Sequence, residues 1–445
     1  MRKQSAADIV RKKLNSEINR IVANKTDYIK NPNTDFTRNR KLPFDKMIKL
    51  MLTMGGSSLS KELYLFAENT KTDVTPSAFV QQRGKMKVRT FRDLFDGFNR
   101  ATLKKKTFHG YRIFAADGTY VNIPRNPDSP TYIQPRNHPE GYNQIHINAI
   151  YDVLTHSYYD VELRPRSKDD ERDALITMLR RNEFKDKTII MADRGYEGYN
   201  MFANFIETKG VDFICRVKDG GSGALAEIDK LPAGELDREI SFEITTTQTN
   251  DDKIHNRRYI PTGSKKGKKL NPNTKIRRWD FQSPYPIRMR VVRFLLDTGN
   301  YETIVTSLAQ NEFSVAEIKN LYQMRWGIET SFRELKYFTD LINLHGKSDE
   351  FAAQEIYIAM IVYNFCTSIT REAVIINSDS NVHIYQVNYS MAFFLCRRFL
   401  KYGEISGRKL MEEIEKHVEP VRPGRKDKRK MRPKAFLGFI YRIAA

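Results

Sequence analysis

Residues 321–338 read LYQMRWGIETSFRELKYF, a stretch with helical periodicity and no proline. Four of its residues, Tyr322, Arg325, Glu329 and Lys336, follow the spacing Tyr-x2-Arg-x3-Glu-x6-Lys. At about 100° per residue these side chains fall within about 60° of one another on an α-helix. The segment therefore predicts a helix with one face that carries a carboxylate, a phenol, a guanidinium and an ammonium group.

Spacing alone leaves two interpretations of this helix face open. A solvated, salt-bridged surface accounts for the charges by themselves. Alternatively, Glu329 ligates a metal ion while Arg325 and Lys336 hold phosphates, because Arg forks onto phosphate oxygens and Lys supplies a point charge. Trp326 lies about 100° further round the helix than Arg325, so we expect it to point into the core.

Two acidic residues follow short apolar runs elsewhere in the chain. Asp117 ends the run YRIFAA and precedes Gly-Thr, and Asp193 ends TIIMA and precedes Arg-Gly-Tyr. Such runs, cut off by turn residues, predict strands whose last carboxylate lies at the carboxyl edge of a sheet. Either aspartate alone could be an ordinary turn residue or a helix N-cap. Together with a helix-borne glutamate they suit Mg²⁺, which takes one or two protein carboxylates and keeps several waters.

These motifs resemble those of the DDE transposases of bacterial insertion sequences, specifically insertion-sequence family four. The likeness extends over roughly residues 40–370 and is carried by Asp117-Gly118-Thr119, Asp193-Arg194-Gly195-Tyr196 and the signature Tyr322, Arg325, Glu329 and Lys336. It implies an RNase H-like catalytic core that performs metal-dependent phosphoryl transfer at transposon ends.

The resemblance also implies roles for individual residues. The metal-binding catalytic triad would be Asp117, Asp193 and Glu329, with two Mg²⁺ or Mn²⁺ ions per active site. Tyr322, Arg325 and Lys336 would contact DNA near the scissile phosphate. Relatives of this fold can also stack an extruded base on an aromatic ring just before the glutamate helix, where Tyr301 lies; stacking needs only a flat exposed ring, but a strand-start aromatic is an equally ordinary explanation.

The charge of the chain points to a polyanionic partner. Among 445 residues, 75 are Lys or Arg and 54 are Asp or Glu, so the net charge is +21. Neutralised phosphates release counterions, and such a balance is typical of nucleic-acid-binding proteins. Charge alone selects no activity, because membrane-surface and ribosomal proteins share it.

Other sequence features exclude several classes of protein. The three cysteines, Cys215, Cys366 and Cys396, form no Cys-x-x-Cys pair, so we expect buried thiols in a reducing cytoplasm. The longest apolar tract, 356–362, is far shorter than the roughly 20 residues of a membrane span, so no membrane partner is expected. The glycines at 220–223 lack phosphate-loop spacing, so no nucleotide cofactor is expected.

The pattern of apolar runs predicts an α/β protein with an RNase H-like core, a mixed five-stranded sheet with flanking helices. From residue 108 to 220 the expected order is strand, hairpin, helix, strand, helix and strand, at 113–116, 145–163, 169–181, 188–192, 199–209 and 213–217. The expected regions are a helical DNA-binding region at 1–105, the core at 106–218 and 301–376, a β-rich insertion at 219–300, and a helical C-terminal region at 377–445.

Three parts of this organisation carry open alternatives. The helices of 1–105 could read DNA or could form a helical cap on the core. The lysine run at 265–269 fits a solvated loop better than a phosphate clamp. The basic tail at 422–434 is typical of a disordered segment that follows phosphates without reading sequence.

The prediction from sequence is a bacterial, cytoplasmic transposase that cuts DNA at the ends of an insertion sequence and joins them to a target. Its partners would be double-stranded DNA with terminal inverted repeats, target DNA, and a second copy of the chain on paired ends. Two rivals remain: a catalytically silent DNA-binding protein with the same fold, and a structure-specific DNA nuclease. A purely structural ribosomal protein explains the charge but not the three ordered acids.

Overall fold

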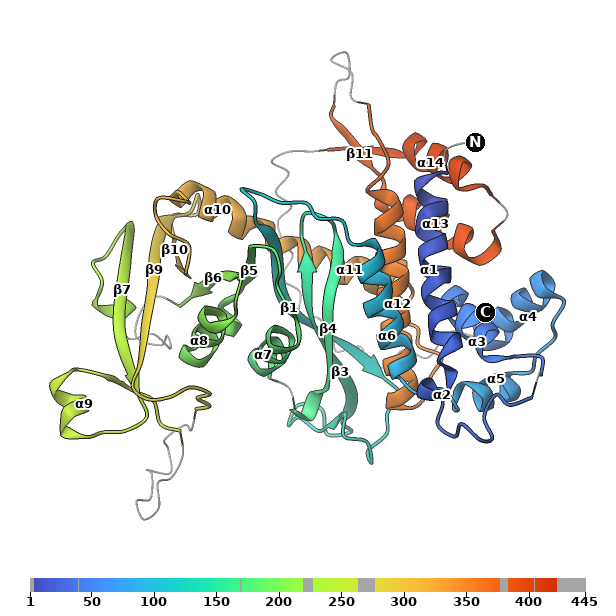
Figure 1. The fold of residues 1–445 in the computed structure, drawn as a ribbon, viewed down its shortest axis with the longest axis horizontal. Coiled ribbons are helices and arrows are strands. Elements are labelled where there is room, and N and C mark those ends of the chain that lie inside the picture. Colours follow the sequence, from blue (N-terminus) through green and yellow to red (C-terminus); the bar gives the residue numbers. More distant parts are fainter. Residues whose placement is uncertain are drawn as a thin grey trace.

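The computed structural model describes residues 4–38, 40–168, 170–218, 227–262, 277–376, 383–403 and 405–421. The glycine run at 220–223, the lysine run at 265–269 and the basic tail at 422–434 lie outside the described residues. The chain forms one large mixed sheet with helices on both of its faces (Figure 1).

Helices dominate the two ends of the chain and strands its middle. The N-terminal helices are α1 (Ala6–Ala23), α2 (Lys25–Tyr28), α3 (Phe44–Thr53), α4 (Leu59–Thr70), α5 (Pro76–Arg83) and α6 (Arg89–Thr102). The middle holds β1 (Arg112–Ile123), β2 (Tyr132–Ile133), β3 (Tyr142–Asp152), β4 (Ser157–Pro165), η1 (Arg166–Lys168), α7 (Glu171–Arg181), β5 (Thr188–Ala192), η2 (Arg194–Tyr196), α8 (Tyr199–Glu207) and β6 (Val211–Val217). These elements match the predicted order from 108 to 220.

The remaining elements complete the sheet and the helical layer. They are η3 (Ile228–Lys230), β7 (Leu236–Thr245), α9 (Asn250–Ile254), β8 (Arg258–Tyr259), β9 (Tyr285–Leu295), β10 (Tyr301–Thr306), α10 (Val315–Met324), α11 (Trp326–Phe338), α12 (Asp349–Thr370), β11 (Tyr385–Val387), α13 (Tyr389–Tyr402), α14 (Gly407–Lys416) and β12 (Val418–Pro420).

The large sheet runs in the order β2-β3-β1-β5-β6-β10-β9-β7-β8, with β4 paired to β3. Strands β3 and β4 form the predicted antiparallel hairpin, whose turn includes His156 with a positive φ of 53°. Strand β1 is antiparallel to β3 and parallel to β5, and β5 is parallel to β6. The parallel pairs at the centre bring the carboxyl ends of β1 and β5 to the same edge.

Alternation along the central strands separates two hydrophobic cores. Ile113 and Ala115 of β1 belong to a core shared with α1, α6 and α10–α14, whereas Phe114 and Ala116 belong to a core shared with α7 and α8. Successive side chains of a strand point to opposite faces of the sheet. Asp117 therefore continues the series 113, 115, 117 on the face that α11 covers.

The N-terminal helices pack on the long buried helix α12. Figure 1 shows α1, α6 and α12 side by side at one end of the sheet, and these helices contact one another. The ring of Phe98 on α6 lies 6.4 Å from that of Phe365 on α12, within the same core as α1. Helices α1 and α6 thus cover the core, as the cap interpretation predicted, and a DNA-reading role for this region stays a prediction.

Two predictions of local structure need correction. Asp117 does not end its strand, because β1 continues to Ile123 while its antiparallel partner β3 still supplies hydrogen bonds. The helix over 321–338 is interrupted at Arg325, where α10 ends and α11 begins. Within the region 219–300, β9 pairs with β10 and β7 pairs with β9, so these strands extend the large sheet.

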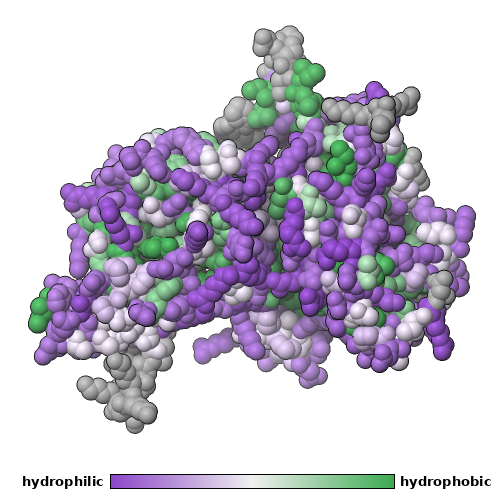
Figure 2. Space-filling model, in the orientation of Figure 1, coloured by the Kyte–Doolittle hydropathy of each residue, from purple (hydrophilic) through white to green (hydrophobic). Residues whose placement is uncertain are grey.

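Burial and surface polarity agree with the composition. The three cysteines are free and buried. In Figure 2 the visible face of the molecule is mostly hydrophilic, with scattered hydrophobic residues. Within the part of the chain that the structure describes, no helix is both long and apolar enough to cross a membrane.

Candidate active site

The two predicted aspartates lie at the same level of the sheet. Ala116 of β1 pairs with Ala192 of β5, and Asp117 and Asp193 are the residues that directly follow this pair in the sequence. Strand β5 stops there while β1 runs on to Ile123. Both aspartates thus lie at the carboxyl end of the β1–β5 pairing, although only Asp193 follows the end of its strand.

Backbone N–H groups hold both aspartates. The Gly118 N–H donates to Asp117 Oδ1 at 2.8 Å, and the Gly195 N–H donates to Asp193 Oδ1 at 2.7 Å. Asp193 caps the short helix η2, so it also serves the N-cap role that the sequence left open. One oxygen of each carboxylate is thereby fixed by a backbone N–H group.

Arg325 joins the helix carboxylate to the sheet carboxylate. Its Nη2 donates to Glu329 Oε1 at 3.0 Å, and its Nη1 lies 3.6 Å from Asp117 Oδ2. The guanidinium is buried, and its Nε and Nη1 have no hydrogen-bond partner among the described residues. Glu329 is thus brought to the same site as Asp117, and the helix face predicted from spacing points at the sheet edge.

The helical hydrogen bonding changes at Arg325. The N–H of Arg325 bonds to the carbonyl of Tyr322, and the N–H of Ile328 bonds to the carbonyl of Arg325, both three residues back. Such bonds tighten the turn relative to a regular α-helix. Trp326, which follows, is 48% exposed rather than buried, so the expectation that it points into the core is wrong. Its ring lies 5.0 Å from the Arg325 guanidinium and covers part of it.

The electrostatics of the site favour a cation. Burial raises the pKa of Asp117 to about 7, the Gly118 N–H and Arg325 oppose that shift, and the nearby charges of Asp193 and Glu329 add to it. Burial disfavours the ionised form of a carboxyl group, and neighbouring carboxylates do so further. Negative charge is therefore concentrated at this edge beyond what Arg325 neutralises.

The predicted DNA contacts differ in accessibility. Lys336 is half-buried, and its Nζ donates to Thr119 Oγ1 at 2.7 Å, which places the ammonium group beside β1 just past Asp117. Tyr322 is only 4% exposed, its hydroxyl has no hydrogen-bond partner among the described residues, and burial raises its pKa. Lys336 is at the site as it stands, whereas Tyr322 is covered.

Tyr301 lies apart from these residues in the contacts that the structure describes. It begins β10 opposite Leu295 of β9 and is 46% exposed. An exposed ring at a strand start fits both interpretations given above. Its stacking role stays a prediction.

The donors at the sheet edge are carboxylate oxygens, a ligand type that suits divalent ions such as Mg²⁺. Among the described residues, no three His, Cys, Asp or Glu side chains gather closely enough to hold one metal ion. Asp117, Asp193 and Glu329 would therefore hold metal ions with only one or two protein carboxylates per ion. That count is the usual one for Mg²⁺, whose remaining ligands are waters or phosphate oxygens.

Two residues at this edge were not predicted. Glu171, the first residue of α7, has its Oε1 3.4 Å from the Nε2 of His146 on β3. The sequence analysis did not single out Glu171, and a histidine on a strand is usually structural. A possible signal was the run Asp170-Glu171-Arg172 directly after the predicted hairpin, since a helix that follows such a hairpin starts at one edge of the sheet.

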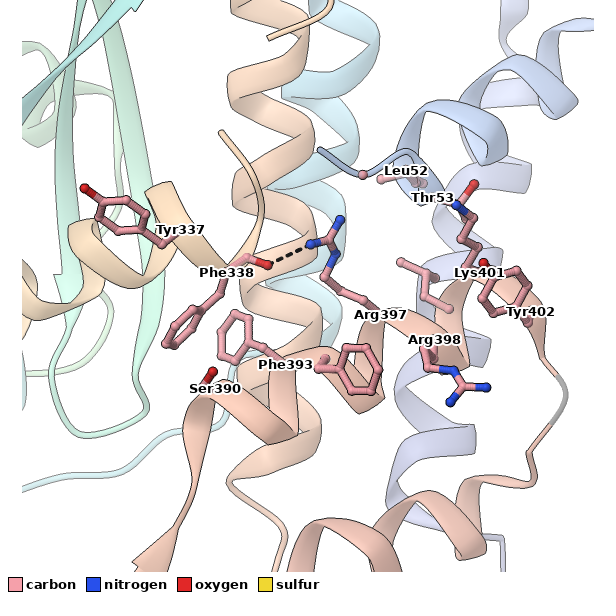
Figure 3. Close-up of a pocket in the computed structure, with 13 residues that line it drawn as sticks. Leu52, Thr53, Tyr337, Phe338, Ser390, Phe393, Arg397, Arg398, Lys401 and Tyr402 are labelled. Carbon is pink, nitrogen blue, oxygen red and sulfur yellow. Dashed lines mark hydrogen bonds between the residues drawn. The ribbon is translucent and has the colours of Figure 1, made fainter. Parts of the chain in front are cut away.

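A separate pocket of about 360 Å³ lies at the C-terminal end of α11 (Figure 3). The Arg397 Nη1 donates to the carbonyl of Phe338 at 2.9 Å and to Asp340 Oδ2 at 2.7 Å, so α13 fixes the end of the helix that carries Glu329. None of the three predicted triad residues lines this pocket.

A protein family and a solved structure are similar to this chain. The sequence profile of the transposase DDE domain matches residues 108–365. A search of the curated proteins finds no match. Among solved structures, the piggyBac transposase synaptic complex with hairpin DNA is similar, with a TM-score of 0.44 and 11% sequence identity over 94% of this chain and 84% of that chain.

Proposed function

Because the chain belongs to the transposase DDE-domain family, we propose that it binds the ends of an insertion sequence, cuts them and joins them to target DNA. The proposal includes the finer assignment to insertion-sequence family four, which rests on the spacing of Tyr322, Arg325, Glu329 and Lys336. Its substrates would be double-stranded DNA with terminal inverted repeats and a target duplex.

One observation carries the proposal. Asp117 and Asp193 directly follow the paired residues Ala116 and Ala192, and Glu329 reaches the same edge through its shared contact with Arg325. Three acids that are far apart in sequence therefore converge where burial, and to a smaller degree the charges of Asp193 and Glu329, raise the pKa of Asp117. A DNA-binding protein without catalysis has no need for this concentration of carboxylates.

The order of the central strands supports an RNase H-like core. Strands β4, β3, β1, β5 and β6 lie side by side, with β3 antiparallel to both of its neighbours and β1, β5 and β6 parallel to one another. We propose that these five strands form the catalytic sheet and that β10, β9, β7 and β8 extend it.

Each residue of the site has a proposed role. Asp117 would be shared between two divalent ions, with Asp193 and Glu329 each holding one of them. When bound, such a pair supplies an activated hydroxyl nucleophile and charge stabilisation for the leaving oxygen of an in-line displacement. Arg325 holds Glu329 toward Asp117 and has buried N–H groups left for a phosphate oxygen.

Binding to DNA would be largely electrostatic. The net charge of +21 favours phosphate contacts, and Lys336 would place an ammonium group beside the scissile phosphate. Paired element ends would be held by two copies of the chain, with the exposed ring of Tyr301 stacking on an extruded base.

The test is a cleavage assay on linear DNA that carries the inverted repeats flanking the reading frame. The wild-type protein should cut these ends only with Mg²⁺ or Mn²⁺, and Glu329→Gln should not. Glu350→Gln serves as a matched control, because Glu350 pairs on the surface with Lys30. Equal cleavage by wild type and Glu329→Gln would refute the site.

A second arm of the same assay separates a transposase from a structure-specific nuclease. Competitor DNA with scrambled ends should not reduce cleavage of the true ends, whereas competitor with intact ends should. A protein that cuts branched DNA regardless of terminal sequence would contradict the proposed function.

A further inference from the structure

Glu171 reaches the catalytic edge from the opposite side to Glu329. Strand β4 ends at Pro165, which pairs with Ile145 of β3, and Ile145 in turn pairs with Val121 of β1. Helix α7 therefore starts at the level of the sheet that lies just beyond Asp117. Its N-cap is Asp170, whose side chain accepts from the two following N–H groups after Glu171, so Glu171 is free of the capping role.

The two oxygens of Glu171 face the two catalytic motifs. A Cβ built on Gly118 would lie 3.1 Å from Glu171 Oε1, and one built on Gly195 would lie 3.2 Å from Glu171 Oε2. Asp193 Oδ1 is 2.9 Å from that same point at Gly195. Gly118 and Gly195 thus leave space for Glu171, and at Gly195 the same space also borders Asp193.

A wall of stacked side chains holds Glu171 in this position. His146 is fully buried with its Nε2 3.4 Å from Glu171 Oε1, and its ring stacks on Tyr120 with centroids 4.2 Å apart. The Arg166 guanidinium lies 4.3 Å from the centre of the Tyr120 ring on that side. The His146 ring occupies the space beside Gly118, where a Cβ would be 2.2 Å from its Nε2.

Salt bridging does not account for Glu171. Among the described residues, no lysine or arginine forms an ion pair with it, and His146 is its one ionic contact. Burial raises the pKa of Tyr196, and the charges of Glu171, Asp117 and Asp193 raise it further. All three carboxylates are therefore close enough to act on this one phenol. Glu171 keeps 34% of its side chain exposed, so hydrated ions can reach it.

We propose that Glu171 is a fourth carboxylate of the active site, which binds the divalent ion at Asp193 through a water of that ion, with His146 as its positioning residue. This inference rests on the proposed function. Contact through water follows from the geometry, because no three of the described acidic or histidine side chains lie close enough to hold one ion directly. Mg²⁺ retains several waters when protein-bound, and residues that orient them strengthen binding.

Titration with Mn²⁺, followed by electron paramagnetic resonance on the metal-free full chain without DNA, tests the inference. Glu171→Gln should weaken Mn²⁺ binding about tenfold, the lower end of the effect of outer-shell partners. It should shift the Mg²⁺ midpoint of DNA cleavage upward by a similar factor, with the rate recovered at saturating Mg²⁺. Glu183→Gln, at an exposed position after α7, should match wild type in both measurements.

The outcomes distinguish this inference from the proposed function. Wild-type Mn²⁺ affinity in Glu171→Gln, together with a clear loss in Asp193→Asn, overturns the role of Glu171 and leaves the proposed function standing. No Mn²⁺ binding by the wild-type protein overturns both. If the amide variant does not fold, Glu171→Asp gives the same test, because it keeps the charge but withdraws the oxygens by one methylene; affinity equal to wild type would then overturn the inference.

Discussion

Two buried arginines of this protein differ in how many of their guanidinium N–H groups have a hydrogen-bond partner. Arg83, at the end of α5, donates to Gln354 Oε1 at 2.8 Å, to Glu355 Oε1 at 2.7 Å and to the carbonyl of Phe351 at 2.6 Å. Every part of its guanidinium that faces α12 is used. Arg325 at the sheet edge donates one hydrogen bond, to Glu329, and leaves its Nε and Nη1 without a partner among the described residues.

The carboxylates beside the two arginines differ in the same way. Glu355 also accepts from the backbone N–H groups of His345 and Gly346, and although burial opposes it, Arg83 and His345 lower the pKa of Glu355 to about 2. Burial raises the pKa of Asp117 beside Arg325 to about 7. Complete pairing stabilises a fold, whereas incomplete pairing leaves charge and donors for a ligand.

The largest expected effect is on cleavage. Asp193→Asn should slow cleavage of element ends by about 10³-fold or more, because it removes a metal ligand whose ion contributes several kcal/mol, and each 1.36 kcal/mol is tenfold. Asp186→Asn is the matched control: it lies before the other end of β5 and pairs with Lys105 at 2.8 Å. Similar cleavage rates for the two variants would contradict a special role for Asp193 compared with Asp186.

The next effect concerns stability and tests the two arginines directly. Arg83→Ala should lower the free energy of unfolding by about 3–5 kcal/mol, since it leaves Glu355 buried without its partner. Arg325→Ala should cost less, because Asp117 can take up a proton and Glu329 is 39% exposed to water. Urea unfolding of metal-free protein at pH 7 measures both. An equal loss would show that Arg325 is as structural as Arg83.

The pH dependence of stability should have opposite signs at the two networks. The folded pKa of Asp117 lies above its unfolded value of 3.8, so the folded state keeps a proton that the unfolded state has lost. Metal-free stability therefore falls as pH rises from about 4 to about 7, by about 1.4 kcal/mol per unit at most. Asp117→Asn should abolish this decline and be more stable than wild type at pH 8 by about 4 kcal/mol.

Glu355 provides the internal control for that measurement. Its folded pKa of about 2 lies below its unfolded value of 4.5, so its contribution is present above about pH 4.5 and is lost as pH falls toward 2. Unfolding curves in EDTA from pH 3 to 8 separate the two windows. Saturating Mg²⁺ should raise the stability of wild type at pH 8 more than that of Asp117→Asn, because ligand binding stabilises the folded state. If the unfolding free energy of wild type and of Asp117→Asn declined equally between pH 4 and 7, the decline would not come from Asp117.

Local patterns in the sequence were sufficient for most individual elements. The strand predicted at 188–192 is β5 residue for residue, and the helix predicted at 169–181 begins within two residues of α7. The apolar run before Asp193 likewise predicted that this residue follows the end of its strand. These features depend on side-chain alternation within one segment, which the sequence displays directly.

Features that depend on a distant partner were missed. Asp117-Gly118 resembles a turn, but β3 extends beyond it and keeps β1 straight. Trp326 is a large apolar residue of the kind found in cores, but it is 48% exposed and lies against the Arg325 guanidinium. Glu171 acquires its setting only when α7 packs on β3, β4 and β1. No spacing rule within 321–338 or around Asp193 contains that information.

The smallest expected effect comes from a third arginine, which lies between the two extremes. Arg397 of α13 is 25% exposed and satisfies the Phe338 carbonyl and Asp340, a residue with a positive φ of 59° at the end of α11. Arg397→Ala should lower the free energy of unfolding by about 1.5–3 kcal/mol, the usual contribution of hydrogen bonds to a charged group. Cleavage at saturating Mg²⁺ should change less than tenfold, because Arg397 touches none of the triad.

Arg408→Ala is the control for this variant, since Arg408 is 85% exposed and pairs only along its own helix with Glu412. Its loss should cost no more than about 0.5 kcal/mol. Among the three buried or half-buried arginines, the loss of stability on substitution would then be largest for Arg83, whose donors are used most completely. The loss of cleavage rate would be largest for Arg325, whose donors are used least completely. A large catalytic loss in Arg397→Ala at unchanged stability would break this inverse relation and would mean that the end of α11 transmits its position to Glu329.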